Sequence, residues 1–190
     1  SYDLFDDKSA SPKVWGLFSQ FKFLKIKNFD DANELYYIGF QSNFSAFNDV
    51  MGKETRHSIG LRRFGTLYER WKYNTEIIYQ FGDIDGSSIR AFSIETDWKF
   101  TFRGQKFSPT PGLKLDWASG DNRAGDGKIE SFNPLFVNPG IYSLAAVNTP
   151  VNLIGIHPSL TLFPAKGLLL TLELAMIYRD SKEDGLYSHP

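Results

Sequence analysis

The sequence has no cysteine, no long apolar run and no excess of charge of one sign. Without cysteine the chain can form neither a disulfide nor a thiolate metal site. No apolar run approaches the roughly 18 residues that a membrane-spanning helix needs. The 21 basic residues nearly balance the 22 acidic ones. We therefore expect no nucleic-acid partner, because nucleic-acid binders usually concentrate a basic excess on one face.

Aromatic residues are abundant, at 16% of the chain, and they follow a period of two. In residues 70–81 the odd positions are mostly aromatic or aliphatic, whereas the even positions are mostly charged or amide residues. Residues 91–102 and 168–179 repeat this alternation. Segments of about ten alternating residues are typical of strands that cross an outer membrane. The pattern predicts strands with one apolar and one polar face.

Weaker alternation in five further segments brings the expected total to about eight strands. In the second strand we expect Tyr36, Ile38, Phe40 and Phe44 to form the apolar face. We expect the connections to alternate in length, with every second link long, as in bacterial barrels with short periplasmic turns and long outer loops. The expected short links are 29–33, 64–66, 103–106 and 164–167, and the long ones are 48–54, 82–88, 120–149 and the segment from 180 onward.

The predicted fold class is all-β, an antiparallel transmembrane β-barrel formed by residues 1–190 as a single domain or barrel fragment. A soluble lipocalin-like β-barrel that binds a small apolar ligand is the alternative, since its strands also alternate. Large aromatic residues near the strand ends favour the membrane barrel, because they match an aromatic girdle. They are Trp71, Tyr73, Tyr79, Phe81, Phe100, Phe102, Trp117 and Tyr178.

Four segments, in this order along the chain, carry a family resemblance. They are YNTEIIYQFG (73–82), GLKLDWASGDNRAGDGKIESFNPLF (112–136), VNLIGIHPSLTLFP (151–164) and YRDSKEDGLY (178–187). In this combination the chain resembles the alginate export family of outer-membrane β-barrels. The second segment is the most specific, because a strand ending in Asp-Trp-Ala-Ser-Gly-Asp leads into a long loop with a second Asp-Gly.

The resemblance implies a channel in the bacterial outer membrane for export or diffusion of a hydrophilic, polysaccharide-like and anionic solute. The partners it implies are the lipid bilayer, the solute and envelope proteins. It also implies a barrel of up to eighteen strands, so about eight strands would be the C-terminal portion of a larger barrel. No final strand with a terminal aromatic residue precedes His189 and Pro190, which agrees with that expectation.

Charged residues on the predicted polar face are the candidates for solute selectivity, because fixed charges that line a pore select among solutes. Arg70 and Lys72, two residues apart, form the best candidate for a basic stripe. The alternative is that opposite charges merely pair across strands. The candidate lumen residues are Arg56, Arg62, Arg70, Lys72, Glu76, Glu95, Asp97, Lys99, Lys114, Asp116, Glu173 and Arg179.

Metal binding and catalysis have little support in the sequence. Asp83, Asp85, Asp121 and Asp126 lie in predicted outer loops and offer oxygen ligands for calcium, although turn chemistry explains Asp-Gly equally well. We expect no other cofactor. We also expect no enzymatic activity. The alternative, an outer-membrane hydrolase, would use a Ser–His pair, for which Ser159 beside His157 is the candidate.

Overall fold

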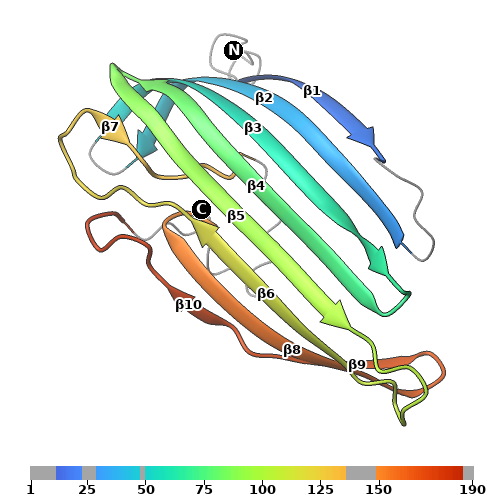
Figure 1. The fold of residues 1–190 in the computed structure, drawn as a ribbon. Coiled ribbons are helices and arrows are strands. Elements are labelled where there is room, and N and C mark those ends of the chain that lie inside the picture. The colour runs from blue at the N-terminus through green and yellow to red at the C-terminus, as the bar shows by residue number, and fades with distance from the viewer. Residues whose placement is uncertain (1–11, 23–28, 48–49, 136–148, 186–190) are drawn as a thin grey trace, which may run out of the picture.

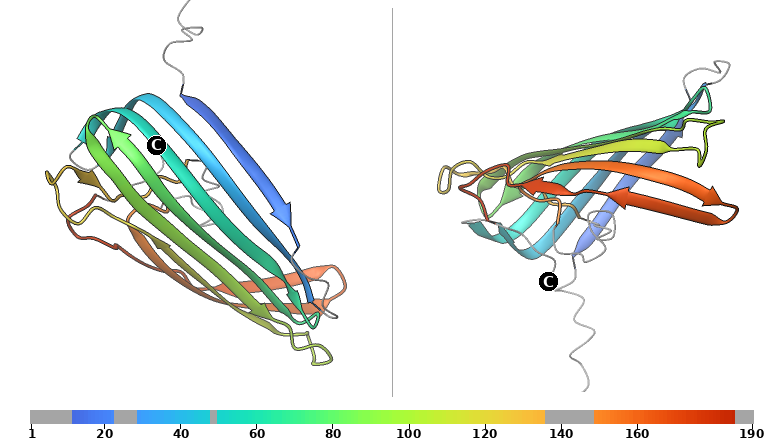
Figure 2. Two further views of the ribbon diagram at one scale, coloured as in Figure 1. Left: turned by 45° about the horizontal axis from the view of Figure 1, so that its top comes forward. Right: turned by 90° about the horizontal axis from the view of Figure 1, so that it is seen from below.

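The chain folds as one curved antiparallel β-sheet (Figure 1). This computed structural model describes residues 12–22, 29–47, 50–135 and 149–185. Strands that follow one another in the chain are neighbours in the sheet, in the order β1-β2-β3-β4-β5-β6-β8-β10, with β9 paired to β8. The sheet is not closed, since β1 and β10 lie at its two edges. Its curvature is visible in both views of Figure 2.

The described part of the chain contains ten strands, eight of which follow the main path of the sheet. The short strand β7 differs from the rest, because it returns from a long loop and pairs in parallel with β5. The strands are β1 (Lys13–Phe21), β2 (Phe29–Phe47), β3 (Val50–Leu67), β4 (Trp71–Ile84), β5 (Ser87–Phe100), β6 (Thr110–Ala118), β7 (Lys128–Ile129), β8 (Leu153–Ala165), β9 (Leu168–Glu173) and β10 (Met176–Tyr178).

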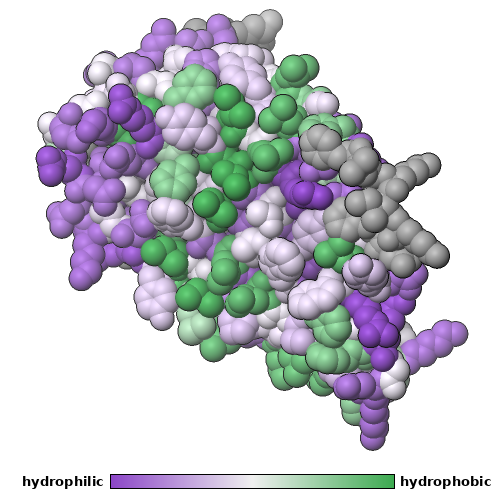
Figure 3. Space-filling view, viewed as in Figure 1, coloured by the Kyte–Doolittle hydropathy of each residue, from purple (hydrophilic) through white to green (hydrophobic). Residues whose placement is uncertain are grey.

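The register assigns every residue to one of two faces, because directly opposed residues of antiparallel strands point to the same side. Leu61, Ile77 and Ile94 are opposed in one row of the outer face. Aromatic side chains on this face are well exposed, with Trp71 at 42%, Tyr79 at 48% and Trp117 at 39%. Figure 3 shows the resulting apolar area across the middle of the molecule. This exposure excludes the soluble lipocalin-like barrel, whose apolar face would be its core.

The inner face is polar over most of its area, and a few apolar contacts gather at one end. We call this the loop end, where β6 ends and the long connection 119–152 begins; the opposite end, with the turn 68–70, is the turn end. At the loop end Phe132 packs with Ala91 and Ala118, and Ile129 packs with Ile84 and Ile89. Residues 129–132 of this connection therefore pack back against the sheet. No helix in the described ranges is long and apolar enough to span a membrane.

Two of the predicted long connections are wrong. Most of 48–54 belongs to β3, and most of 82–88 belongs to β4 and β5, which are separated only by the two-residue turn 85–86. The strands continue beyond the amphipathic stretch, where the alternation of apolar and polar residues stops but the backbone pairing does not. The predicted short links 29–33 and 64–66 likewise lie within β2 and β3. The predicted short link 103–106 lies within a nine-residue connection between β5 and β6, and among the described links the connection after β6 is longer still.

The predicted apolar face of β2 is also wrong. Ile38 is opposed to Ser58, and Phe40 to Arg56, which places both on the inner face. The outward positions are occupied by Leu35, opposed to Leu61, and by Tyr37. Alternation shows that a strand has two faces, whereas the choice of the membrane face requires the register with its neighbours.

Candidate solute pathway on the inner face

A row of five charged residues crosses the middle of the inner face. Glu34 is opposed to Arg62, which is opposed to Glu76; next come Glu95 and Asp116, on the following two strands. We call these five residues the charged row. Arg62 Nη1 lies 3.2 Å from Glu34 Oε2. Four carboxylates against one arginine need further partners, since like charges at opposed positions destabilise a sheet.

Tyr36 supplies one of these partners from the neighbouring row. Its hydroxyl donates a hydrogen bond of 2.7 Å to Glu76 Oε1, across two strands. The ring lies over Gly60, where an added Cβ would be only 2.0 Å from the tyrosine ring carbon Cζ. Glycine at position 60 therefore lets an aromatic side chain cross the sheet surface and reach the carboxylate.

A second group of partners surrounds Asp116. Lys114 Nζ lies 3.5 Å from Asp116 Oδ1 and 3.9 Å from Glu95 Oε1. On the other side His157 Nε2 lies 3.0 Å from Asp116 Oδ2, and His157 Nδ1 lies 3.6 Å from Glu173 Oε1. Asp116 and His157 are both almost completely buried. The excess of carboxylates in the charged row is thus partly offset by Lys114, one row away.

At the loop end a buried arginine ties three elements together. Arg56 is fully buried; its Nε donates to Glu54, and its Nη1 donates to Gln80 Oε1 at 2.7 Å. The same Nη1 donates to the carbonyl of Ser131 at 3.3 Å. Gln80 also binds the loop backbone, because it accepts from the amide of Asn133 and donates to its carbonyl, both at 2.8 Å. The sheet therefore holds residues 131–133 against its inner face.

The loop is held from its other side by residues far apart in the sequence. The Asp184 carboxylate accepts hydrogen bonds from Ser131 Oγ at 2.6 Å and from the amide of Asp121 at 2.8 Å. Asn152 donates to the carbonyls of Ser181 and Gly185 and accepts from the amide of Ser181. All of these side chains are buried, so their bonds are shielded from water except the one to the Gly185 carbonyl, which is partly buried.

Ser119 and Gly120 complete this arrangement at the end of β6. Ser119 Oγ donates to the carbonyl of Glu130 at 2.6 Å and accepts from the amide of Phe92 at 2.9 Å. A Cβ added to Gly120 would lie 2.1 Å from Asn152 Oδ1, so only glycine allows this contact. We call the whole set the loop cluster; its members are Ser119, Gly120, Asp121, Ser131, Asn152, Ser181 and Asp184.

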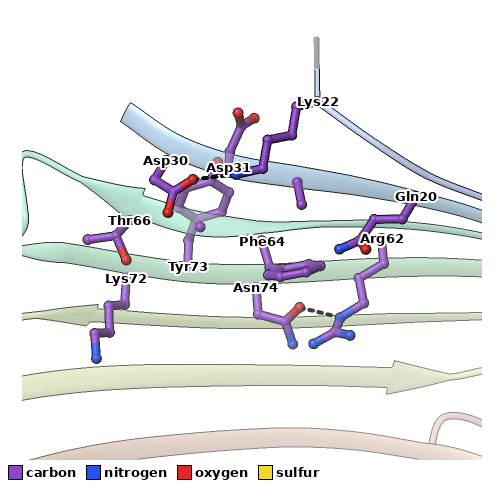
Figure 4. A pocket seen from close by; sticks show the side chains of 12 residues that line it. Gln20, Lys22, Asp30, Asp31, Arg62, Phe64, Thr66, Lys72, Tyr73 and Asn74 are labelled. Carbon is purple, nitrogen blue, oxygen red and sulfur yellow. Dashed lines mark hydrogen bonds and ion pairs between the residues drawn. The ribbon is translucent and has the colours of Figure 1, made fainter. Parts of the chain in front are cut away.

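At the turn end the inner face is open instead, and a hollow of about 510 Å³ lies across β1 to β4 (Figure 4). We call it the turn-end pocket. Lys22 Nζ lies 2.6 Å from Asp30 Oδ1, and this hydrogen bond raises the pKa of Lys22. Arg62 Nε donates to Asn74 Oδ1 at 2.7 Å, and its guanidinium lies 4.5 Å from the centre of the Phe64 ring. The remaining lining residues are Gln20, Asp31, Ala32, Gly65, Thr66, Lys72 and Tyr73.

The structure places most predicted lumen residues on the inner face, although their role in selectivity stays a prediction. Arg70 is an exception, because it lies in the turn between β3 and β4 rather than on a strand with Lys72. The predicted basic stripe is therefore not a stripe on one strand. Arg179 directly follows β10. The residues on the inner face are Arg56, Arg62, Lys72, Glu76, Glu95, Asp97, Lys99, Lys114, Asp116 and Glu173.

The four candidate calcium ligands do not come together. Asp83 Oδ1 caps its own hairpin by accepting from the amide of Gly86, and Asp126 Oδ1 accepts from the amide of Lys128. Asp85 lies in that hairpin turn, whereas Asp121 is buried in the loop cluster. Within the described ranges no three His, Cys, Asp or Glu side chains are grouped as metal ligands. Calcium binding at these residues stays a prediction.

Sequence reasoning missed the loop cluster, although its members lie in segments that carry the family resemblance. Ser119, Asn152 and Asp184 come from three of those segments, separated by more than thirty residues at each step. The signal was present in the sequence as short motifs around Ser-Gly-Asp, Asn-Leu and Asp-Gly. What could not be inferred is that these motifs bind one another.

An antiparallel sheet with an exposed apolar outer face and a charged inner face is the wall of an outer-membrane β-barrel. The chain matches the family described as Alginate export over residues 16–190. It therefore belongs to the alginate export family, a family of outer-membrane export channels. Its open sheet fits part of such a barrel. No curated protein matches the chain.

Proposed function

We propose that this chain forms part of the wall of an outer-membrane channel that passes a hydrophilic, polysaccharide-like solute. The observation that supports the proposal most strongly is the contrast between the two faces. Charged and amide side chains line the inner face from the turn end to the charged row, while the outer face is apolar and aromatic. A lipid bilayer would cover the outer face, and water and solute would occupy the inner one.

The inward-folded loop has a natural role in such a channel. Residues 131–133 are bound to Arg56 and Gln80 on the inner face, so the loop occupies part of the cross-section at the loop end. An exported solute would meet the charged row first and pass the loop after it. Envelope proteins could deliver or receive the solute at either end.

Hydrolysis is a weaker candidate. Of the elements of a Ser–His–Asp triad, His157 and Asp116 are in contact, at 3.0 Å. The structure records no hydrogen bond between Ser159 and His157, so the described residues include no activated hydroxyl at this histidine.

A liposome permeation assay tests the proposed function. The purified protein is reconstituted into liposomes, and the entry of neutral sugars of increasing size is followed by swelling. We expect entry that becomes slower with solute size, because a water-filled lumen narrowed by a loop discriminates by size. Heat-denatured protein serves as the control. If folded, inserted protein admits no sugar of any size, the channel proposal is wrong.

A further inference from the structure

The turn-end pocket has the chemistry of a binding site, and its hydrogen-bonding groups are largely uncommitted. The structure shows no hydrogen bond from the Gln20 amide, the Asn74 Nδ2 group or the Thr66 hydroxyl to another described residue. An amide both donates and accepts, and so does a hydroxyl. Phe64 adds an aromatic surface beside these groups, as Figure 4 shows. Aromatic surface with a few convergent polar groups is typical of small-molecule sites.

The charges around the pocket are mostly compensated. Lys22 is paired with Asp30, and Arg62 with Glu34. Asp31 is paired with Arg63, at 2.8 Å. Among the described residues that line the pocket, Lys72 is the one cation for which the structure records no carboxylate partner. A site for a polyanion needs several uncommitted cations, and this pocket offers a single one.

The neighbouring part of the wall strengthens this conclusion. A chain-like solute that occupies the pocket and continues toward the loop end meets the charged row next. Glu76, Glu95 and Asp116 lie there, and Lys114 beside them is already in contact with two of these carboxylates, Glu95 and Asp116. A second carboxylate-bearing unit would face these side chains at close range and be repelled. A neutral chain would meet only hydrogen-bonding partners.

We propose that the turn-end pocket binds one uncharged sugar residue of a saccharide chain, and that the solute of this channel is a neutral glycan rather than a polyuronate. The apolar face of the sugar ring would lie against Phe64. Its hydroxyl groups would bind Asn74, Gln20 and Thr66. This inference rests on the proposed function, since a glycan reaches the inner face only if the barrel conducts it.

A matched pair of oligosaccharides tests the inference. The probes are a β-1,4-linked mannose hexamer and the corresponding mannuronate hexamer, which differ only by oxidation at C6. Binding to the purified protein is measured by calorimetry in a detergent without a sugar headgroup, so that detergent does not compete. We expect the neutral hexamer to bind about tenfold more tightly. Equal or tighter binding of the mannuronate hexamer, or no binding of the neutral one, would overturn the inference.

Variants locate the binding site. Phe64→Leu keeps apolar volume but removes the ring, and Asn74→Ala removes the amide; each should weaken binding of the neutral hexamer about fivefold, the size expected for a lost stacking contact or hydrogen bond. Thr75→Ala, next in sequence but on the opposite face, is the matched control and should leave binding unchanged. Gln20→Ala gives an independent test if a variant on β3 or β4 fails to fold. Unchanged affinity in all folded pocket variants would contradict the assignment.

The permeation assay separates the two proposals. Protein that admits small sugars but binds the neutral hexamer no better than mannuronate refutes the inference and leaves the channel intact. Protein that admits no sugar refutes the proposed function itself. Selective binding of the neutral hexamer, lost in Phe64→Leu and Asn74→Ala, supports the inference.

Discussion

The two ends of the inner face are built from the same strands but differ in their access to water. At the loop end Arg56, Glu54 and Gln80 are almost completely buried beneath the folded-back loop. At the turn end the Lys22 and Asp30 side chains are 61% and 84% exposed although they too form an ion pair. Removing one partner of a buried pair is costly because the other charge is left unpaired away from water, whereas breaking an exposed pair costs little. We therefore expect substitutions at the loop end to change the stability of the fold, and substitutions at the turn end to change the proposed interaction with solute.

Arg56→Ala should have the largest effect on this contrast. It leaves the Glu54 carboxylate buried without its cation, which costs about 3–5 kcal/mol of unfolding free energy. Denaturant unfolding of the detergent-solubilised protein measures the loss. The double variant Glu54→Leu/Arg56→Met, which removes both charges, should recover most of it. A loss below about 1 kcal/mol for Arg56→Ala would show that water reaches the ion pair between Arg56 and Glu54 at the loop end.

Asn152→Ala should have the second largest effect on stability. It removes three hydrogen bonds of Asn152, two buried and one partly buried, at about 1 kcal/mol each. It also places alanine at a backbone φ of 50°, which asparagine tolerates better. We expect about 3 kcal/mol of destabilisation and faster proteolysis within residues 119–135 of the folded protein. Asn122→Ala, which loses one exposed hydrogen bond to Glu130, is the control and should change neither.

Gly60→Val probes the region between the two ends. The new side chain would displace the Tyr36 ring and break its bond to Glu76, so we expect about 1–2 kcal/mol of destabilisation by overpacking. Thermal unfolding measures it. Adding Tyr36→Ala to Gly60→Val should relieve the clash. If the double variant is no more stable than Gly60→Val, the contact between ring and glycine is not the cause.

Lys72→Glu should have the smallest effect on stability, because Lys72 is exposed at the turn end. Its effect should instead be on ion selectivity, measured as the reversal potential across a planar bilayer under a salt gradient. We expect a shift toward cations, since the variant adds a carboxylate beside the turn-end pocket. Arg70→Glu, in the adjacent turn, should shift the potential less. An equal shift would indicate that the turn also lines the pathway.

Several parts of this architecture could be predicted from the sequence, and the reasons differ by element. The faces of β4, β5 and β8 were predicted correctly, because their apolar sides are so rich in large residues that the membrane side is unambiguous. In β2 both faces carry apolar residues, since Tyr36, Ile38 and Phe40 lie on the inner face. Because alternation does not give the register with the neighbouring strands, the apolar residues of β2 were assigned to the membrane face although they lie on the inner face. The family assignment, which is confirmed, rested on short motifs. The sequence did not predict that these motifs contact one another in the loop cluster.

The sequence by itself determined the two-faced strands, their antiparallel order and the membership in the alginate export family. These three features depend on local alternation and on short motifs, and both can be recognised directly in the sequence. Only the tertiary structure decided that Arg56 and Gln80 hold the loop, that Asn152 and Asp184 bind segments far away in the chain, and that the turn-end pocket is left open. Those features depend on which residues the register and the loop bring together, and pairing across distant segments follows from packing rather than from local pattern.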